Sequence, residues 1–310
     1  MTKKISVLIA CYNEEENVKD IYLRVREIFS KLPQYEYEHI FIDNGSTDNT
    51  VAILKGLAAE DKNLKIIVNT RNFGHVRSPF HGLRQTSGDA VILLAADFQD
   101  PPDLIPKFLE EWEKGYKVVA AVKTNSKENP LMFALRNFYY GLVKKIADVE
   151  QTKNFFGFGL FDRAVIDELR KIDDPYPYFR GLINEMGYKK AIVEYVQPRR
   201  MKGKTKNNFY TLYDMAMLGF VSYSKLPLRL ASFIGFVASF LSLVIAFVYL
   251  VLKLVYWQQF QLGLAPLVIG IFFFSSVQLF FIGVFGEYIG AIYTQVKKRP
   301  LVVERERVNF

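Results

Sequence analysis

The sequence predicts an α/β domain with a doubly wound, mostly parallel sheet, followed by two helices that span a membrane. Three observations indicate this fold class. Short apolar runs alternate with helical patterns over residues 5–122, polar clusters follow these runs, and two long uncharged stretches lie near the C-terminus. Such alternation is typical of parallel sheets with helices on both faces. The pattern shows no internal repeat and no low-complexity tract.

The stretch GDAVILLAADFQDPPD at residues 88–103 is the centre of the predicted sheet. Its apolar run is short enough for a strand that is covered on both faces. Asp97 then follows a strand's carboxyl end, where ligands bind in open α/β sheets. Asp97, Gln99 and Asp100 offer oxygen atoms of the kind that a hard divalent cation prefers. The alternative is that the two aspartates form only a turn and a helix cap.

Each expected element has its own local signal. β-branched and apolar runs predict strands, clusters of Asn, Asp, Ser and Gly predict turns and helix N-caps, and paired prolines suit a helix's first turn. The expected strands are 5–10, 39–43, 64–69, 90–96 and 117–122, with helices at about 14–29, 49–59, 76–85 and 102–114. Further helices are expected at 131–149, 162–170 and 178–186, and the glycine-rich aromatic segment 154–160 should lie close to ligand or backbone.

Four polar residues, Asn13, Asp43, Arg71 and Asp97, each follow one of the expected strands. Because parallel strands end at the same edge of a sheet, the four loops should converge there. The sequence therefore predicts a nucleotide site at this edge.

Charge and cysteine content narrow the class of protein. The net charge of +8 would suit a nucleic acid or an anionic membrane surface, but the basic residues cluster beside the apolar stretches, which favours the membrane and not nucleic acid. Cys11 is the one cysteine, which excludes an internal disulfide and makes a thiolate metal site a poor explanation. The N-terminus turns acidic after too short an apolar run for a cleavable signal.

Residues 230–252 and 262–286 lack charged side chains, and each stretch exceeds the roughly 20 residues that a spanning helix needs. Basic residues lie before the first stretch and after the second: Lys225, Arg229, Lys297, Lys298 and Arg299. The positive-inside rule then places both termini in the cytoplasm. The expected organisation is a cytoplasmic domain at 1–206, amphipathic interfacial helices at 207–228, membrane helices at 229–256 and 262–286, and a cytoplasmic tail at 287–310.

Six segments, in order, resemble family-2 glycosyltransferases of the polyprenyl-phosphate type, such as dolichyl-phosphate mannose synthase and bacterial undecaprenyl-phosphate glucosyltransferases. They are VLIACYNEEENV, FIDNGSTDNT, NTRNFGH, AADFQDPPDL, RRMKGKTK and GVFGEYIGAIYTQVKKRP. The resemblance implies a GT-A fold and the inverting, Mg²⁺- or Mn²⁺-dependent transfer of one sugar from a nucleotide sugar to a polyprenyl phosphate. It also implies the cytoplasmic leaflet of a bacterial plasma membrane, undecaprenyl phosphate as lipid, UDP-glucose or a UDP-N-acetylhexosamine as donor, and a capacity to form tetramers.

The resemblance also assigns roles to individual residues. The implied donor-binding residues are Tyr12, Glu14, Asp43, Arg71 and Asp97, of which the first three would cradle the base and ribose. The implied metal ligands are Asp97 and Gln99. The implied phosphate-binding residues are Arg200 and Lys206, with Lys123 and Arg136 as further candidates for the lipid phosphate. Each of these cations could instead be a solvated surface charge.

Two positions depart from the family pattern. Ala95 stands where the Asp-x-Asp metal motif has its first aspartate, so metal binding would depend on Asp97, Gln99 and the donor phosphates. Gly157 stands where relatives have an aspartate that is taken as the catalytic base. Either another carboxylate serves, with Glu185 as the candidate, or no base is needed. The second option is reasonable because a phosphate monoester, with a second pKa of about 6, is already largely ionised at neutral pH.

Two other functions compete with this prediction. A processive polysaccharide synthase would be expected to carry a Gln-x-x-Arg-Trp motif and more membrane helices, and the sequence has neither. A degenerate, non-catalytic membrane subunit would account for Ala95 and Gly157. The presence of Asp43, Asp97 and Gln99 argues against such decay.

Overall fold

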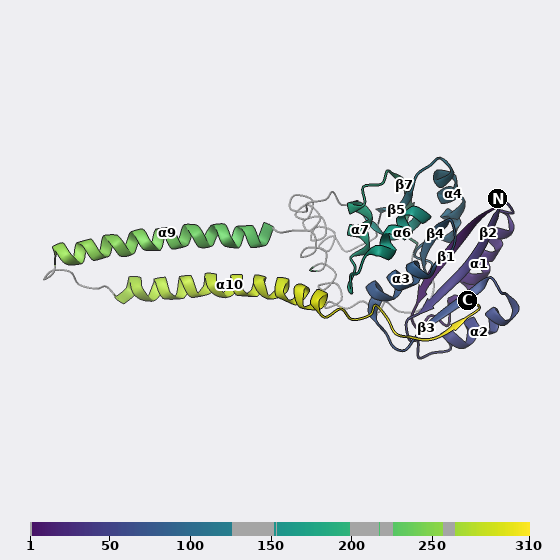
Figure 1. The fold of residues 1–310 in the computed structure, drawn as a ribbon, viewed down its shortest axis with the longest axis horizontal. Helices are drawn as coiled ribbons and strands as arrows, with labels where there is room; N and C mark the ends of the chain where they lie inside the picture. Colours follow the sequence, from purple (N-terminus) through teal and green to yellow (C-terminus); the bar gives the residue numbers. More distant parts are fainter. Residues whose placement is uncertain (1, 126–151, 153, 199–216, 218–225, 257–263) are drawn as a thin grey trace.

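The computed structural model describes residues 2–125, 152, 154–198, 217, 226–256 and 264–310 (Figure 1). These residues form one eight-stranded sheet with the order β7-β5-β6-β4-β1-β2-β3-β8, with helices around it and two long helices beyond it. The elements are β1 (Lys3–Cys11), α1 (Val18–Ser30), β2 (Tyr35–Asp43), α2 (Thr50–Glu60), β3 (Leu64–Asn69), α3 (Gly74–Gln85), β4 (Ala90–Ala95), η1 (Pro102–Leu104), α4 (Ile105–Glu113), β5 (Val118–Asn125), β6 (Phe155–Asp162), α6 (Arg163–Lys171), α7 (Phe179–Glu185), β7 (Lys190–Val196), α9 (Leu226–Val255), α10 (Leu264–Val296) and β8 (Glu304–Val308).

The central strands are apolar because helices cover both faces of the sheet. β1 pairs in parallel with β2 and β4, and most residues of these three strands are buried. Ile21 of α1, Leu54 of α2 and Phe108 of α4 join the core on one face. Phe80 of α3 and Val165 of α6 join the core on the other. The doubly wound, mostly parallel sheet predicted from the alternating pattern is therefore confirmed.

β6 and β8 run against the other strands of the sheet. β6 lies between β4 and β5 and is antiparallel to both, and β8 is antiparallel to β3. The segment expected to lie close to ligand or backbone forms most of β6, where a Cβ at Gly159 would lie 2.2 Å from the carbonyl oxygen of Val119. The sequence pattern does not predict β6, β7 or β8 as strands. The expected helix at 131–149 lies outside the described residues, as does most of the interfacial segment at 207–228.

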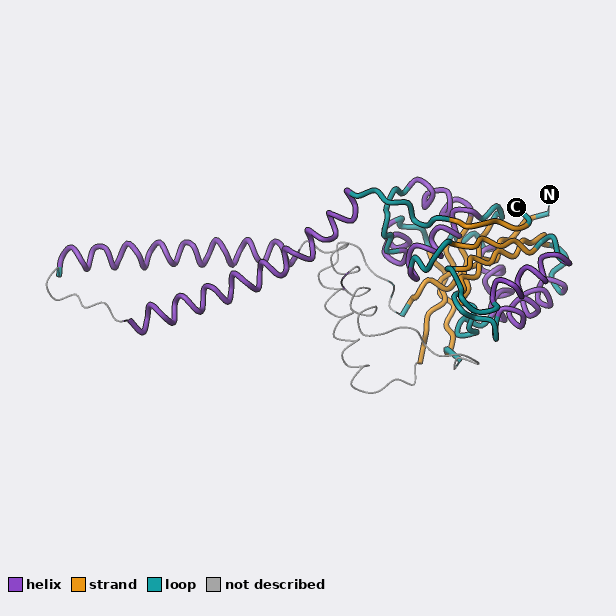
Figure 2. Tube along the Cα trace, turned by 90° about the horizontal axis from the view of Figure 1, so that it is seen from below, coloured by secondary structure: helices purple, strands orange, loops and turns teal. Residues whose placement is uncertain are grey.

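The helices α9 and α10 lie side by side and extend away from the sheet (Figures 1 and 2). Their stretches Leu226–Ile245 and Gly270–Val296 have mean hydropathies of 2.1 and 1.6 and are long enough to cross a membrane. Phe236 and Phe272 are 77% and 70% exposed. Because such a surface is unfavourable in water, the helix pair is suited to association with a membrane.

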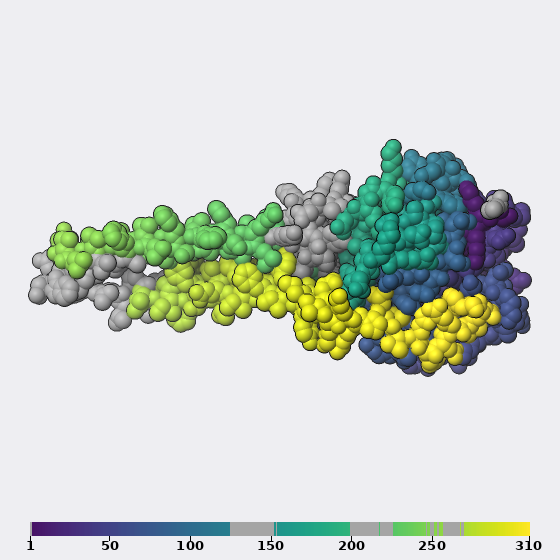
Figure 3. Space-filling view, viewed as in Figure 1, coloured from purple at the N-terminus to yellow at the C-terminus, as the bar shows by residue number. Residues whose placement is uncertain are grey.

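Beyond α10 the chain returns to the domain and lies across its surface, where β8 adds to the edge of the sheet (Figure 3). The expected tail at 287–310 therefore begins inside α10 and ends as a strand. Leu301 and Val302 are buried in the core on the α3 face. The main-chain N–H of Thr70 donates to the carbonyl oxygen of Val303 at 2.9 Å. These contacts attach the chain's last residues to the domain.

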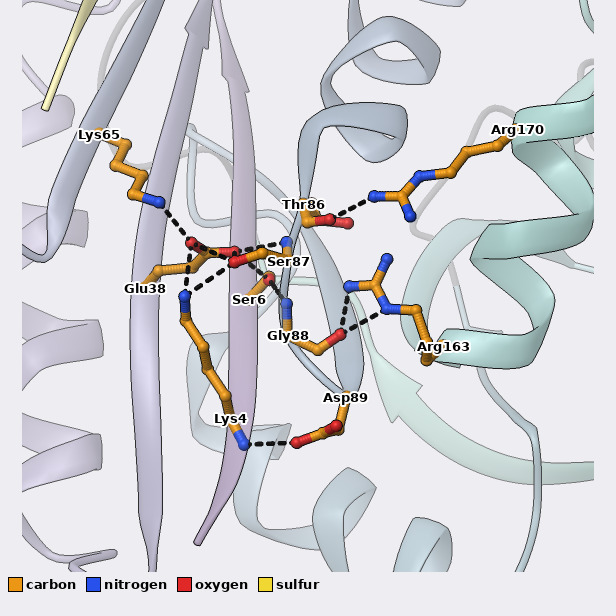
Figure 4. Close-up of polar contacts among 10 residues, drawn as sticks. All are labelled: Lys4, Ser6, Glu38, Lys65, Thr86, Ser87, Gly88, Asp89, Arg163 and Arg170. Atoms are coloured by element: carbon orange, nitrogen blue, oxygen red, sulfur yellow. Dashed lines mark hydrogen bonds and ion pairs between the residues drawn. The ribbon is translucent and has the colours of Figure 1, made fainter. Parts of the chain in front are cut away.

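A buried carboxylate, Glu38, joins the amino ends of several strands (Figure 4). It accepts hydrogen bonds from Ser6 Oγ at 2.5 Å and from the main-chain N–H of Ser87 at 2.7 Å. Lys4 Nζ and Lys65 Nζ lie 3.0 and 2.8 Å from its Oε2. The Glu38 side chain is 2% exposed, so β1, β2, β3 and the turn before β4 meet at one desolvated charge.

The ionisation of Glu38 makes this junction dependent on pH. Burial would raise the pKa of Glu38, but hydrogen bonds from Lys65, Ser6, Ser87 and Lys4 lower it to about 2. An unfolded glutamate titrates at about pH 4.3. Because the folded pKa is lower, the ionised carboxylate stabilises the fold above the unfolded pKa, and this contribution is lost as the pH falls toward the folded value.

We expect Glu38→Gln to lower the free energy of unfolding by about 3 kcal/mol at neutral pH, because the hydrogen bonds that hold the folded pKa of Glu38 at about 2 lose their charged acceptor. The difference from wild type should shrink in acid. Thermal unfolding of the detergent-solubilised protein across this pH range measures both effects. Glu113→Gln is the control, since Lys3 and Glu113 are 47% and 41% exposed and such pairs contribute about 0–1 kcal/mol. Equal melting temperatures for the two variants at neutral pH would contradict this role of Glu38.

Candidate functional site

The loops after β1 and β2 are joined by hydrogen bonds at the carboxyl edge of the sheet. Asn13 Oδ1 accepts from the N–H of Thr47 at 2.8 Å, and the N–H of Asn13 donates to Ser46 Oγ at 2.8 Å. The N–H of Glu14 donates to Thr50 Oγ1 at 2.8 Å. Asn13 has a φ of 52°, a conformation that costs energy in a residue other than glycine. The two loops therefore form one preorganised surface.

Asp43 is fully buried at the end of β2 and organises the loop that follows. Its Oδ2 accepts from the N–H groups of Gly45 at 3.0 Å and Ser46 at 2.9 Å. Burial raises the pKa of Asp43, while the hydrogen bonds from Ser46 and Gly45 and the charge of Arg305 act in the opposite direction. The hydroxyl of Ser46 also donates to Oδ1, and the Cys11 thiol lies 3.9 Å from the same oxygen, so most of the carboxylate's roughly four acceptor positions are occupied within the loop.

The loop after β3 places Arg71 against the loop after β2. Asn44 Oδ1 accepts from the N–H of Phe73 at 2.9 Å, and Asn44 Nδ2 donates to Asn72 Oδ1 at 2.9 Å. A Cβ at Gly45 would lie 2.5 Å from the carbonyl carbon of Arg71, and Gly45 has a φ of 75°. Both facts require glycine where the loops touch. The Arg71 guanidinium lies 4.0 Å from the centroid of the Phe73 ring, on the exposed side of this junction.

The chain turns sharply after β4, and two aspartates lie in this turn. Phe98 has a φ of 60°, so the turn contains a strained residue. Asp97 Oδ1 accepts from the N–H of Gln99 at 3.1 Å. Asp100 Oδ2 accepts from the N–H of Ala95 at 3.1 Å. The turn therefore returns to the end of β4 and fixes the carboxylates of Asp97 and Asp100 by main-chain hydrogen bonds.

The electrostatics of this turn suit a divalent cation. Burial raises the pKa of Asp100 to about 6; the charge of Lys123 lowers the pKa and that of Asp97 raises it. The hydroxyl of Tyr195 donates to Asp100 Oδ1 at 3.3 Å, and burial, together with Asp100, raises the pKa of this tyrosine. A cation held by Asp97 and Gln99 would offset the excess negative charge. Among the described residues no three His, Cys, Asp or Glu side chains form a metal cluster, so phosphates and water would complete the coordination.

A cavity of about 250 Å³ opens beside the turn, between β4, β6, α3 and α7. Its lining is mostly apolar and includes Phe80, Leu93 and Phe179. Ala95 and Asp100 line the part next to the turn. A mainly apolar cavity with a few polar groups is typical of a site for an organic ligand.

Two cations lie at the aromatic wall of this cavity. Lys123 Nζ is 4.2 Å from the centroid of the Phe156 ring, and the Arg180 guanidinium is 5.3 Å from the same centroid. Phe156 and Arg180 line the cavity. Two cations on one aromatic ring suit the binding of an anionic group. Lys123 is among the residues predicted from the sequence, whereas Arg180 is not, because its position depends on how α7 packs against β6.

The structure gathers the predicted donor residues on neighbouring loops. Tyr12 and Glu14 follow β1, Asp43 ends β2, Arg71 follows β3 and Asp97 follows β4. Tyr12 and Glu14 are half-buried. The convergence expected of parallel strands is therefore present.

The predicted base and most of the predicted phosphate-binding residues are not among those placed on these loops. Glu185 is exposed at the end of α7 and does not line the cavity, whereas Gly157 does. Three of the predicted phosphate-binding residues, Arg136, Arg200 and Lys206, lie outside the described residues.

Comparison with known proteins identifies the family. Residues 6–170, more than half of the chain, match the model of glycosyl transferase family 2. A bactoprenol glucosyl transferase of Shigella phage SfX is 35% identical over 305 residues, which cover 98% of this chain and 99% of that protein. The chain belongs to glycosyl transferase family 2.

Other relatives match over a similar length. The prophage bactoprenol glucosyl transferase homolog of Escherichia coli is 35% identical, covering 96% of this chain and 97% of that protein. The uncharacterized glycosyltransferase YkcC of Bacillus subtilis is also 35% identical, covering 96% of this chain and 92% of that protein. Among solved structures, glucosyl-3-phosphoglycerate synthase of Mycobacterium tuberculosis, in complex with Mn²⁺, UDP and phosphoglyceric acid, is 16% identical with a TM-score of 0.49, covering 71% of this chain and 76% of that one.

Family membership and the sheet together confirm the predicted fold class. The domain is a Rossmann-like GT-A fold with a mostly parallel sheet, and two long apolar helices follow it near the C-terminus. The prediction of a family-2 glycosyltransferase of the polyprenyl-phosphate type is also confirmed, because the full-length relatives include bactoprenol glucosyl transferases.

We expect Gly45→Ala to lower the free energy of unfolding by about 1–3 kcal/mol, because the new methyl group meets the main chain of Arg71 at a positive φ. Gly56→Ala is the matched control. Gly56 lies inside α2 with no atom within 4 Å of the added Cβ, so alanine should raise the free energy of unfolding by about 1 kcal/mol. Melting temperatures of the two variants test this difference, and a change of the same sign in both would contradict it.

Proposed function

We propose that this chain transfers one sugar from a nucleotide-sugar donor to undecaprenyl phosphate in a bacterial plasma membrane. The observation that carries the proposal is the match to proteins named bactoprenol glucosyl transferases over 96% and 98% of the chain, which includes both apolar helices. The donor would be UDP-glucose or a UDP-N-acetylhexosamine. The product would be a lipid-linked monosaccharide for modification of a cell-surface glycan.

The same proposal gives the chain an orientation in the membrane. Lys297, Lys298 and Arg299 follow α10 directly, and Arg229 lies near the start of α9. With both helices spanning the bilayer, the positive-inside rule places the catalytic domain and both termini in the cytoplasm. The carboxyl edge of the sheet would then act on lipid phosphates of the cytoplasmic leaflet. Assembly as a homotetramer stays a prediction.

In this proposal the donor lies across the loops after β1, β2, β3 and β4. Tyr12, Glu14, Asp43 and Arg71 would hold the nucleoside, since carboxylates accept from base N–H and ribose hydroxyl groups. Asp97 would lie at the diphosphate, because its loop is the next one along the sheet edge. The sugar would then point toward the cavity beside Ala95 and Asp100.

Asp97 and Gln99 would hold Mg²⁺ or Mn²⁺ at the diphosphate. When bound there, a divalent cation neutralises charge that develops on the departing nucleoside diphosphate. The chain's own contribution is to fix these oxygen ligands in the tight turn, where the N–H of Gln99 orients Asp97 at 3.1 Å. Ala95 leaves one carboxylate fewer than the family motif supplies.

The acceptor phosphate would lie at the wall of the cavity near Lys123 and Arg180. In an inverting transfer, a phosphate oxygen forms a bond to the sugar's anomeric carbon while the bond to the nucleoside diphosphate breaks on the opposite side. With a second pKa of about 6, the acceptor oxygen is largely ionised at neutral pH and needs no base. The exposed position of Glu185, away from the cavity lining, supports this account.

A transfer assay tests the proposed function. The purified full-length protein in detergent is incubated with undecaprenyl phosphate, Mg²⁺ or Mn²⁺ and radiolabelled UDP- and GDP-sugars, and product is extracted with the lipid. One sugar in a single-residue lipid product supports the proposal and names the donor. A polymer would support a processive synthase instead. Nucleotide binding without any product would support the degenerate subunit.

We expect Asp97→Asn to abolish metal-dependent turnover and to weaken Mn²⁺ binding at least about tenfold, because the strongest anionic ligand of the turn is lost. Electron paramagnetic resonance of free Mn²⁺ measures binding independently of activity. Asp103→Asn is the control, since Asp103 is 59% exposed and pairs with Arg24. Near-normal turnover of the Asp97 variant across a metal titration would refute the assignment.

We expect Glu185→Gln to change turnover by less than about threefold, because general-base catalysis contributes about 10²–10⁴-fold and the proposal assigns none to Glu185. Initial rates at saturating donor and lipid measure this effect. A hundredfold loss with unchanged donor binding would instead make Glu185 the base that replaces the residue absent at Gly157.

A further inference from the structure

The C-terminal strand β8 brings an arginine to the edge of the sheet where the donor is proposed to bind. Val68 of β3 pairs with Asp43 on one side and with Glu306 of β8 on the other. Asp43 and Glu306 therefore lie in one row across the sheet, separated by two strand spacings of about 4.8 Å each. Because β8 runs antiparallel to β3, the residue before Glu306 lies farther toward the ligand edge.

That residue, Arg305, occupies a bulge in the pairing. Val68 pairs with Glu306, but the next residue, Asn69, pairs with Glu304, so Arg305 is the extra residue of β8. Bulges redirect side chains and are common next to active sites. The hydrogen bond from the N–H of Thr70 to Val303 at 2.9 Å fixes the chain just beyond the bulge.

The charged neighbours of Arg305 already have partners within the domain. Glu306 pairs with Lys55 of α2 at 2.5 Å, and Glu304 contacts His81 of α3 at 2.5 Å. Arg307 binds Glu304 and also donates to Gln85 at 2.8 Å. Arg305 is exposed and forms no hydrogen bond or ion pair with another described residue.

Arg305 acts electrostatically on the proposed nucleoside site. Its charge opposes the rise in the pKa of Asp43 that burial causes. Arg71 emerges from the loop after β3, one residue past Thr70, and therefore lies on the same side of the sheet edge. An arginine fork donates to base carbonyl and ribose oxygens, and its plane can stack on a base.

We propose that Arg305 is a donor-binding residue that contacts the nucleoside part of the donor beside Asp43. This inference rests on the proposed function, which supplies the nucleotide donor. In this proposal, a residue from beyond α10 completes the donor site. Only eight residues lie between Val296, the last residue of α10, and Arg305. The strand β8 then serves in donor recognition as well as in covering the edge of β3.

Binding of UDP and of UMP to the purified full-length protein in detergent tests the proposal by titration calorimetry. We expect Arg305→Ala to weaken binding of both nucleotides about tenfold, as for the loss of a hydrogen bond from a charged group. The KM for the donor should rise by a similar factor, with kcat within about twofold of wild type. Arg305→Lys, which keeps the charge but loses the fork, should recover only part of the affinity.

Arg307→Ala is the matched control, because Arg307 lies in the same strand but binds Glu304 and Gln85. It should leave nucleotide binding unchanged. Unchanged affinity in Arg305→Ala, or an equal loss in the Arg307 control, would overturn the inference and leave the proposed function intact. A loss seen with UDP but not with UMP would overturn the nucleoside contact. If the wild-type protein bound neither UDP nor GDP, both proposals would fail.

Arg305→Ala could lower the melting temperature as much as the Arg307 control does. In that case Arg305→Gln is the second variant, because glutamine is closer in size to arginine and carries no charge. Its affinity for UDP decides between the two roles. Binding within twofold of wild type would make Arg305 a structural residue only, whereas a tenfold loss in a stably folded variant supports donor binding.

Discussion

The buried carboxylate of Glu38 joins three strands and a turn at the amino edge of the sheet, and the opposite edge depends on this junction. Ser6, Lys4 and Lys65 come from β1 and β3, and Ser87 comes from the turn before β4. These bonds fix how the strands are aligned along their length. The loops that leave the carboxyl ends of the strands therefore start from defined positions. The turns at Asn13 and Phe98, which have positive φ, need such fixed starting points to hold their polar groups in place.

Much of the fold follows from local sequence signals. The strands β1 to β5 are predicted because they are buried on both faces and bounded by turn residues, so burial and local propensity agree. The sequence ERERV of β8 has no such signal, since each residue is partly exposed or exposed, and only the free edge of β3 makes it a strand. The alternating pattern of β7 is present in KAIVEYV but is short and follows a turn-rich segment. The sequence pattern does not predict β6 as a strand either, because its glycines break the strand pattern. All three missed strands depend on partners that are distant in the sequence.

The candidate site also has parts that could be predicted from the sequence and parts that could not. The loops proposed to bind the donor could be predicted, because each follows a strand and parallel topology brings strand ends together. The cavity could not, because its walls combine α3, the antiparallel strand β6 and the short helix α7. Arg180 could not be predicted either, because nothing near it in the sequence indicates a ligand. Its proposed part in phosphate binding rests on the Phe156 ring, which both Arg180 and Lys123 contact. The link between Arg305 and Asp43 likewise requires the chain to return from α10.

The two departures from the family pattern have one physical consequence. Ala95 and Gly157 both line the cavity, and the resemblance implies an aspartate at each position. With both acids absent, Asp100 is the only carboxylate lining the cavity among the described residues, and burial raises its pKa. Charges interact strongly where water is excluded, so each missing carboxylate lowers the repulsion that a phosphate dianion would meet there. A cavity with fewer acids and with Lys123 and Arg180 at its wall favours an acceptor that arrives already ionised. The absence of a base at Gly157 and the choice of a phosphate as nucleophile are then consistent features of one site.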